Sequence, residues 1–354
     1  MGLFFLILSI VLILLSILPF IPNQHWVFRV PEFISLQLLI LHVTAIIGLS
    51  IFTNETNLFW TVFIIQIAII IYHCYLFSSY TKFYKTQKQK NTKQLKEMKI
   101  ISANIYQFNK EFERFKDFIR KEDPDIFLTI ESNSDWEKSM RELERNYPHT
   151  EKITLENTYG MHLYSKIPFE KITTHYFVAD DVPSIEAHFK DENDEDFAVF
   201  FVHPPPPSPT EEANSKERDG DLLCVAKKVK QLNKPTLVIG DFNTVAWSNI
   251  SKLFRKNSGL IDGRHGRGVL ASFHAKYWFF RAPLDLVFHS PNIFLKELTV
   301  LENVGSDHFP ISCVMCIDKT DHCQKEEVED ISKKENQETE EIIQEGKEEE
   351  SEKR

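Results

Sequence analysis

The chain has 354 residues, of which 43 % are hydrophobic, and its formal net charge is −10. Its five cysteines do not form the dense framework on which small disulfide-stabilised secreted domains depend, so that class of protein is excluded. The composition changes along the chain, from an apolar N-terminal part through a mixed middle part to an acidic end.

Three apolar stretches occupy the N-terminal part, at residues 3–21, 33–52 and 58–77. Each approaches the ~20 residues with which a helix crosses a bilayer. The first stretch also suggests a signal peptide, but it lacks a basic start and a small-residue cleavage site, and two further stretches follow it. The sequence therefore predicts a three-helix transmembrane domain over residues 1–80, with the membrane lipid bilayer as a partner.

A lysine-rich stretch follows the third apolar stretch. Residues 81–99 contain seven lysines and one glutamate, and we predict a polybasic linker over 81–97. A solvated linker is the simpler interpretation, but lysine and arginine also gather on the cytoplasmic side of short membrane loops. With three spans, loop 22–32 lies on the same side as this linker. We therefore expect an external N-terminus and a multi-pass protein of the inner (cytoplasmic) membrane whose soluble domain faces the cytoplasm.

The middle part, residues 98–318, is long enough for one sizeable core. Apolar stretches of strand length are interspersed with amphipathic helix patterns, and a long helix is expected over 211–232. Closely spaced strands among helices predict an α/β fold with mixed or antiparallel sheets rather than a strict βαβ repeat. Expected strands include residues 98–105, 125–132, 197–203, 269–273, 284–289, 293–301 and 310–317.

The acidic end comprises residues 319–354. From residue 321 onward it has 14 acidic and 6 basic residues and few large apolar ones, which accounts for −8 of the net charge. Such a composition is typical of disorder, so we predict an acidic disordered tail. The overall acidity therefore says little about the middle part.

Polar side chains lie at the ends of the expected strands. Asp241 and Asn243, in VIGDFN, are two residues apart, and an Asx-type turn explains such a pair without any function. The full set would gather at one edge of a sandwich, where several ionisable groups are costly unless they bind a cation or carry out chemistry. The set comprises Asn104, Glu131, His203, Asp241, Asn243, Asp285, Asp307 and His308.

The motifs SANI, LTIES, MHLYSKIPF, VHPPPP, VIGDFN, PLDLVF and GSDHFP follow one another over nearly all of residues 98–318. In this order they resemble the endonuclease/exonuclease/phosphatase superfamily, which includes deoxyribonuclease I, the AP endonucleases, neutral sphingomyelinases and inositol polyphosphate 5-phosphatases. The HPPPP stretch looks like a bacterial membrane-anchored branch. The resemblance implies an α/β four-layer sandwich of two central mixed or antiparallel sheets flanked by helices, here preceded by three transmembrane helices.

The resemblance also implies a metal site. Glu131 resembles the principal Mg²⁺ ligand, with Asn104 beside it, and Asp307 resembles a further metal-site carboxylate. Oxygen ligands suit Mg²⁺, a hard cation that keeps several waters and binds substrate phosphate directly, and Mn²⁺ is expected to substitute. AP endonucleases carry an acid two residues after the first-strand asparagine. This chain has Tyr106 there, which weakens the AP-endonuclease interpretation.

Five residues resemble catalytic positions of the superfamily. Asp241 matches the group that orients or deprotonates the attacking water, and Asn243 matches the amide that binds a phosphate oxygen. Asp285 and His308 resemble a pair in which the carboxylate orients the imidazole, and the imidazole stabilises charge on the phosphate. His203 matches the histidine that deoxyribonuclease I places on the leaving-group side.

Three further features have two interpretations each. Arg218 faces either a phosphate or solvent on its helix. The glycine-rich basic run 263–268 does not follow a strand as a nucleotide-binding loop would, so a flexible surface loop is favoured over a substrate-facing one. The run YWFFR, 277–281, is either a stacking or lipid-contacting platform or part of the core.

The combined features predict a membrane-anchored, Mg²⁺-dependent phosphoesterase whose catalytic domain, residues 98–318, hydrolyses a phosphodiester by metal-assisted attack of water. The substrate is a nucleic acid in one interpretation and a phospholipid or inositol phosphate in the other. A duplex-DNA enzyme gathers basic residues on its binding face, whereas the lysines here are concentrated in the linker. An inactive membrane-bound binding module is the alternative outside enzymology, and the complete set of acids and histidines argues against it.

Overall fold

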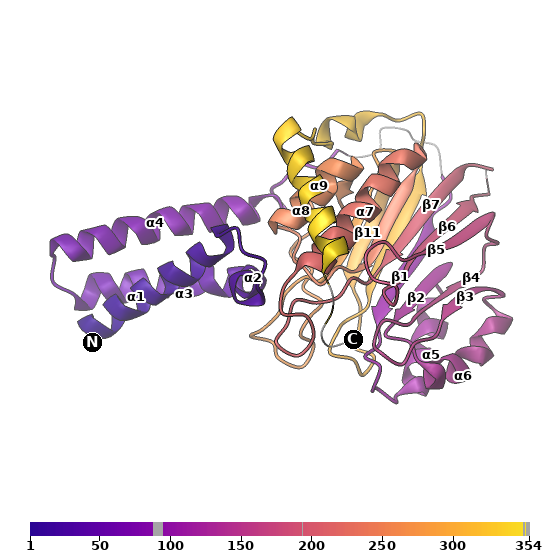
Figure 1. Cartoon of the computed structure of the whole chain (residues 1–354), viewed down its shortest axis with the longest axis horizontal. Helices are drawn as coiled ribbons and strands as arrows, with labels where there is room; N and C mark the ends of the chain where they lie inside the picture. The colour runs from indigo at the N-terminus through magenta and orange to yellow at the C-terminus, as the bar shows by residue number, and fades with distance from the viewer. Residues whose placement is uncertain (88–94, 193, 350, 352–354) are drawn as a thin grey trace.

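Three long apolar helices form the N-terminal part of the computed structural model, which describes residues 1–87, 95–192, 194–349 and 351. Helices α1 (Gly2–Ile17), α3 (Ser35–Phe52) and α4 (Asn57–Ser78) lie side by side and project from the rest of the protein (Figure 1). All three are long and apolar enough to cross a membrane, with α1 extended to Phe20 by the short helix η1 (Leu18–Phe20), in agreement with the predicted number of spans. The short helix α2 (Trp26–Phe33) joins the first two.

The middle of the predicted polybasic linker, residues 88–94, lies outside the described residues.

After the linker, two six-stranded sheets contain all the named strands of the described chain. The first sheet has the order β11-β12-β1-β2-β4-β3, formed by β1 (Met98–Asn104), β2 (Ile126–Ile130), β3 (His149–Ile153), β4 (Met161–Ser165), β11 (Ile293–Val300) and β12 (Ile311–Ile317). The second has the order β5-β6-β7-β8-β10-β9, formed by β5 (Lys171–His175), β6 (Ser184–Lys190), β7 (Asp196–Val202), β8 (Thr236–Asp241), β9 (Ile261–Asp262) and β10 (Asp285–His289).

Alternation along the central strands explains why both faces of each sheet are covered. In β1, Ile100 packs into the core between the two sheets, while Ile101 packs on the opposite face. That outer face is covered by α5 (Phe112–Glu122) and α6 (Ser134–Met140). The outer face of the second sheet is covered by α7 (Lys216–Leu232) and α8 (Asn249–Ser258). The result is the predicted four-layer sandwich of mixed sheets flanked by helices.

The prediction of a disordered tail is wrong. Helix α9 (Lys333–Glu348) packs along α7, as Figure 1 shows. The two helices lie close together at a pair of glycines, where a Cβ on Gly346 would lie 2.7 Å from the carbonyl oxygen of Lys216, and a Cβ on Gly220 would lie 3.1 Å from the Cα of Gly346. Acidic residues of the tail pair with lysines of the sandwich, for example Glu340 with Lys227 at 2.6 Å. Composition alone did not reveal these partners, because they lie elsewhere in the sequence.

The strand expected near 269–273 does not form. Phe273 makes only isolated bridges, to Ala282 and to His308. Residues 273–282 therefore form a loop that is closed by the bridge between Phe273 and Ala282 and lies beside His308.

Candidate active site

The ends of β1, β2, β7 and β8 meet the starts of β10 and β12 at one edge of the two sheets, so the polar strand-end residues come together. Asn104 is paired in register with Ile130, which places Glu131 beside it. In the second sheet, Asp285 is paired directly with Asp241. Glu131 and Asn243 have positive φ angles of 65° and 50°, in the left-handed region that few non-glycine residues adopt.

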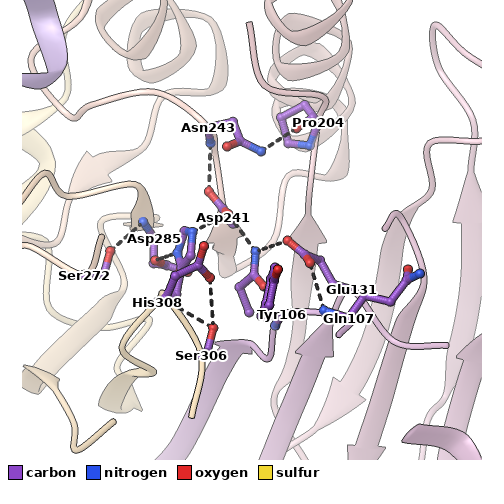
Figure 2. A network of polar contacts seen from close by, with 12 residues as sticks. Tyr106, Gln107, Glu131, Pro204, Asp241, Asn243, Ser272, Asp285, Ser306 and His308 are labelled. Atoms are coloured by element: carbon purple, nitrogen blue, oxygen red, sulfur yellow. Dashed lines mark hydrogen bonds and ion pairs between the residues drawn. The ribbon is translucent and has the colours of Figure 1, made fainter. Parts of the chain in front are cut away.

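A histidine joins the two aspartates of the second sheet (Figure 2). The Nδ1 atom of His308 lies 2.8 Å from a carboxylate oxygen of Asp285, and its Nε2 atom lies 3.6 Å from a carboxylate oxygen of Asp241. All three side chains are buried. The second oxygen of Asp285 has no hydrogen-bond partner among the described residues.

The charge of His308 follows from these neighbours. Burial alone would lower the pKa of its imidazole, but the carboxylates of Asp285 and Asp241 and the hydrogen bond to Asp285 outweigh that effect and raise the pKa to about 10. The side chain is therefore an imidazolium at neutral pH, with one aspartate on each side.

A second group of polar side chains continues from this cluster into the first sheet. The side-chain amide of Asn104 donates to Glu131 at 2.9 Å and to Asp241 at 3.1 Å, so it links the two sheets. Glu131 also accepts a hydrogen bond from the backbone N–H of Gln107 at 3.0 Å. Desolvation raises the pKa of Glu131 to about 7, although both of these hydrogen bonds act in the opposite direction.

Asp307 lies near both Glu131 and His308. Its charge raises the pKa values of both Glu131 and His308, so its carboxylate acts on both groups electrostatically. It is less buried than His308, and its side chain accepts a hydrogen bond from Ser306 at 3.3 Å.

The turn after β8 holds Asn243 in place. Its backbone N–H donates to Asp241 at 3.0 Å, and its side-chain amide donates to the carbonyl oxygen of Pro204 at 2.9 Å. The carbonyl oxygen of Asn243 accepts a hydrogen bond from Arg218 at 2.9 Å. Arg218 is only 1 % exposed, so it neither faces solvent nor lies free for a phosphate, and it instead supports the turn.

His203 follows β7 and is 3 % exposed. Burial lowers the pKa of its imidazole to about 4, so the ring is neutral at neutral pH. Its Nδ1 atom has no hydrogen-bond partner among the described residues, and its ring centroid lies 5.5 Å from that of Tyr159.

Sequence analysis missed one residue that supports the site. Arg264 is fully buried, and its guanidinium donates to the backbone carbonyl of Asp285. It also lies 3.9 Å from Asp262. The favoured interpretation of residues 263–268 as a flexible surface loop is therefore wrong. The sequence shows only an arginine in a glycine-rich run, and that pattern is the same for a buried and for an exposed arginine.

Two oxygen-rich groups in the site could hold a cation. Asp241, Asp285 and His308 each offer a ligand atom, and these atoms lie within 4.8 Å of one another. A metal on His308 would require a neutral imidazole, whereas its aspartate neighbours favour the imidazolium. Glu131 and Asp307 offer carboxylate oxygens, the ligands that suit Mg²⁺, and a bound cation would favour the anionic form that burial disfavours in Glu131. Asn104 also has an amide oxygen, but here that oxygen accepts a hydrogen bond from the backbone N–H of Tyr106 at 3.0 Å and the NH₂ group faces Glu131, so the amide would have to turn over to bind the cation.

Such a sandwich, with carboxylates, an amide and a charged histidine at one sheet edge, is the architecture of a phosphoesterase. Residues 101–308 match the Endonuclease/Exonuclease/phosphatase family, and the chain belongs to this family. The members of this family are hydrolases acting on phosphate esters. No curated protein matches the sequence.

Solved structures with the same fold differ in what they act on. The endonuclease/exonuclease/phosphatase from Bacteroides vulgatus has a TM-score of 0.53 at 18 % identity, over 63 % of this chain and 100 % of that one. A mannosyl-6-phosphatase of Bacteroides thetaiotaomicron VPI-5482 has a TM-score of 0.51 at 18 % identity, over 62 % and 100 %. D. rerio TDP2 complexed with a single strand DNA product has a TM-score of 0.52 at 16 % identity, over 62 % and 98 %. At these identities the likeness shows the fold alone and does not identify a substrate.

Proposed function

We propose that the protein is a membrane-anchored, Mg²⁺-dependent phosphoesterase that hydrolyses a phosphodiester with water. The observation that carries the proposal is the chain of contacts from Asp285 through His308 to Asp241, continued by Asn104 to Glu131. Residues 98–318 would be the catalytic domain, and the family match lies within that range.

The residues of the second sheet have complementary roles in this proposal. Asp241 orients the attacking water and accepts its proton. The imidazolium of His308, held by Asp285, compensates the negative charge that builds up on the phosphate oxygens. Asn243 has one amide hydrogen donated to Pro204 and keeps the other for a phosphate oxygen. His203 is neutral, so it serves the leaving-group side as a hydrogen-bonding group rather than as a preformed acid.

Glu131, Asn104 and Asp307 would hold the Mg²⁺. Their oxygen-only donor chemistry fits this cation, and Mn²⁺ is expected to replace it. A bound Mg²⁺ would polarise the phosphate ester and neutralise part of its charge. Tyr106 stands where AP endonucleases carry a further acid, so that position supplies no additional metal ligand, which favours a single metal ion.

The test uses full-length protein in detergent with bis-p-nitrophenyl phosphate as a soluble diester. Asp241→Asn should lower turnover by at least ~10²-fold without loss of folding, because the residue acts in the transition state. Chelation with EDTA should abolish turnover, and Mg²⁺ or Mn²⁺ should restore it. Asp135→Asn, at an exposed carboxylate of α6, is the control and should change nothing. Full turnover in Asp241→Asn or in EDTA would refute the mechanism.

A further inference from the structure

Four consecutive aromatic residues form the exposed tip of the loop over residues 273–282. Tyr277, Trp278, Phe279 and Phe280 are 52 %, 79 %, 60 % and 38 % exposed. A water-facing surface rarely presents a contiguous run of large apolar side chains, so such a run marks an interaction site. The alternative interpretation of this stretch as part of the core is excluded by the exposure.

The loop tip is attached to a membrane-spanning helix. The side-chain amide of Gln37 donates to the carbonyl oxygens of Phe279 at 3.2 Å and of Arg281 at 3.1 Å. Gln37 is the third residue of the span Ser35–Phe52, at the end nearest the catalytic domain. The tip therefore lies level with the end of the span, at the depth where lipid headgroups surround the helices.

The base of the same loop forms a wall of the candidate active site. Phe273 bridges to His308, and their ring centroids are 4.9 Å apart. The backbone N–H of Ala275 donates to the carbonyl oxygen of Asp307 at 2.6 Å. A single short loop thus joins the catalytic cluster to the membrane surface.

Basic residues flank the aromatic tip. Lys276 precedes it and Arg281 follows it, and both are exposed. The ammonium group of Lys276 also lies 5.9 Å from the ring centroid of Tyr106, a half-exposed aromatic residue two positions after Asn104. Aromatic residues next to cations are typical of segments that lie in the headgroup layer.

Aromatic and basic side chains also bind single-stranded nucleic acids by stacking. The contact with Gln37 favours lipid over a single-stranded nucleic acid as the partner, because aromatic rings at the depth of a membrane span are surrounded by lipid.

We propose that residues 276–281 lie in the headgroup layer of the bilayer and that the active site takes the phosphodiester of a lipid in that same membrane. The inference rests on the proposed function and adds its substrate class. In the reaction, water forms a bond from its oxygen to phosphorus, the ester bond from phosphorus to one alcohol oxygen breaks, and the released alcohol takes up a proton. The membrane supplies the substrate at a high local concentration in the plane of the site.

The first test uses the full-length protein reconstituted into vesicles of phosphatidylethanolamine, phosphatidylglycerol and phosphatidylcholine. Hydrolysis of these lipids and of added bis-p-nitrophenyl phosphate is measured in the same vesicles. The double variant Trp278→Ala/Phe279→Ala should lower lipid turnover at least about tenfold, because it removes two large apolar side chains from the headgroup layer, and it should change soluble diester turnover less than about twofold. Tyr176→Ala, at an aromatic residue 48 % exposed next to β5, is the control and should change neither rate.

The second test reads the position of the loop without catalysis. Brominated phospholipids quench tryptophan fluorescence on contact, so the wild type should be quenched more than Trp278→Phe. Equal quenching, or equal loss of both hydrolysis rates in the double variant, would overturn the inference. Turnover of the soluble diester or of single-stranded DNA with no lipid hydrolysis would reject the lipid substrate and leave the proposed function standing. Hydrolysis of no ester at all would refute the proposed function itself.

Discussion

Asp285 lies directly opposite Asp241 in the register of β10 against β8, and the imidazolium of His308 stands between their carboxylates. The pairing fixes the distance between the two acids through backbone hydrogen bonds rather than through flexible side chains. The guanidinium of Arg264 donates a hydrogen bond to the backbone carbonyl of Asp285 and so holds this strand in place. A shift of the strand would separate His308 from one of its two aspartate partners.

The first prediction concerns Asp285 and His308 as a unit. Asp285→Asn and His308→Ala should each lower turnover by about 10²-fold, because either change removes the oriented cation that faces the phosphate. The double variant should be little worse than the single variants, since residues that act together show strongly non-additive effects. Steady-state kinetics of the four proteins on a soluble diester, with circular dichroism as the folding control, provides the measurement. A loss of turnover near 10⁴-fold in the double variant, the product of the two single losses, would contradict a shared role.

The second prediction concerns Glu131. Glu131→Gln should weaken Mn²⁺ binding by at least about tenfold, because an amide oxygen replaces a carboxylate and its NH₂ group meets the N–H donors of Asn104 and Gln107. Titration of Mn²⁺ by electron paramagnetic resonance, without substrate, separates binding from turnover. Glu170→Gln, at an exposed carboxylate, is the matched control. Unchanged Mn²⁺ affinity in Glu131→Gln would place the metal elsewhere.

Much of the site could be predicted from the sequence, because strand ends are readable. Asn104 and Glu131 are the polar residues at the ends of the apolar runs of β1 and β2, and parallel neighbours end at the same edge. The turn VIGDFN likewise identifies Asp241 and Asn243. The α/β class with mixed sheets followed from the strand and helix patterns, the four-layer sandwich followed from the family resemblance, and the structure confirms both.

The remaining features depend on contacts between distant segments. Arg264 is buried because its guanidinium binds the carbonyl oxygen of Asp285 in β10, and the run GRHGRG does not indicate that partner. Helix α9 is ordered because glycines of α7 and α9 let the two backbones approach, and lysines of α7 and α8 meet its acids. A prediction from local composition gives disorder for such a segment, because it considers the segment's charges without the oppositely charged residues that pair with them in the folded protein.

The third prediction tests the close approach of α7 and α9. Replacing glycine by alanine inside a helix normally stabilises it by about 1 kcal/mol. Gly346→Ala should instead destabilise the protein, because its Cβ would lie 2.7 Å from the carbonyl oxygen of Lys216. Gln344→Ala, at an exposed position of the same helix, is the control. Limited proteolysis of the tail and thermal unfolding in detergent provide the measurements, and greater resistance in Gly346→Ala would show that the helices do not touch there.

The fourth prediction concerns Asp221 in α7, whose two carboxylate oxygens are buried and have no hydrogen-bond partner among the described residues. Burial, with a smaller effect from Glu217, raises its pKa from 3.8 to about 7. Between these two values the folded state binds more protons than the unfolded state, so stability falls as the pH rises from about 4 through 7. Asp221→Asn should remove this loss, and it should melt at a higher temperature than the wild type at pH 8. Melting curves from pH 5 to 8.5, with exposed Asp196→Asn as control, test it. A wild-type slope retained in Asp221→Asn would contradict the assignment.

The fifth prediction concerns the side of the membrane on which the active site lies. The ends of the three apolar helices nearest the sandwich are Phe20, Ser35 and Ser78, so a membrane that these helices cross would meet the sandwich on one face (Figure 1). The lysines that follow Ser78 favour the cytoplasmic face, because basic residues next to a span resist translocation. A C-terminal alkaline phosphatase, which is active only outside the cytoplasm, should therefore be silent, and a C-terminal green fluorescent protein should fluoresce. Changing the lysines at 82, 85, 88, 90, 93 and 96 to glutamine should weaken that preference and raise the phosphatase signal. An active phosphatase fused to the unchanged chain would place the site, and any lipid it acts on, in the outer leaflet.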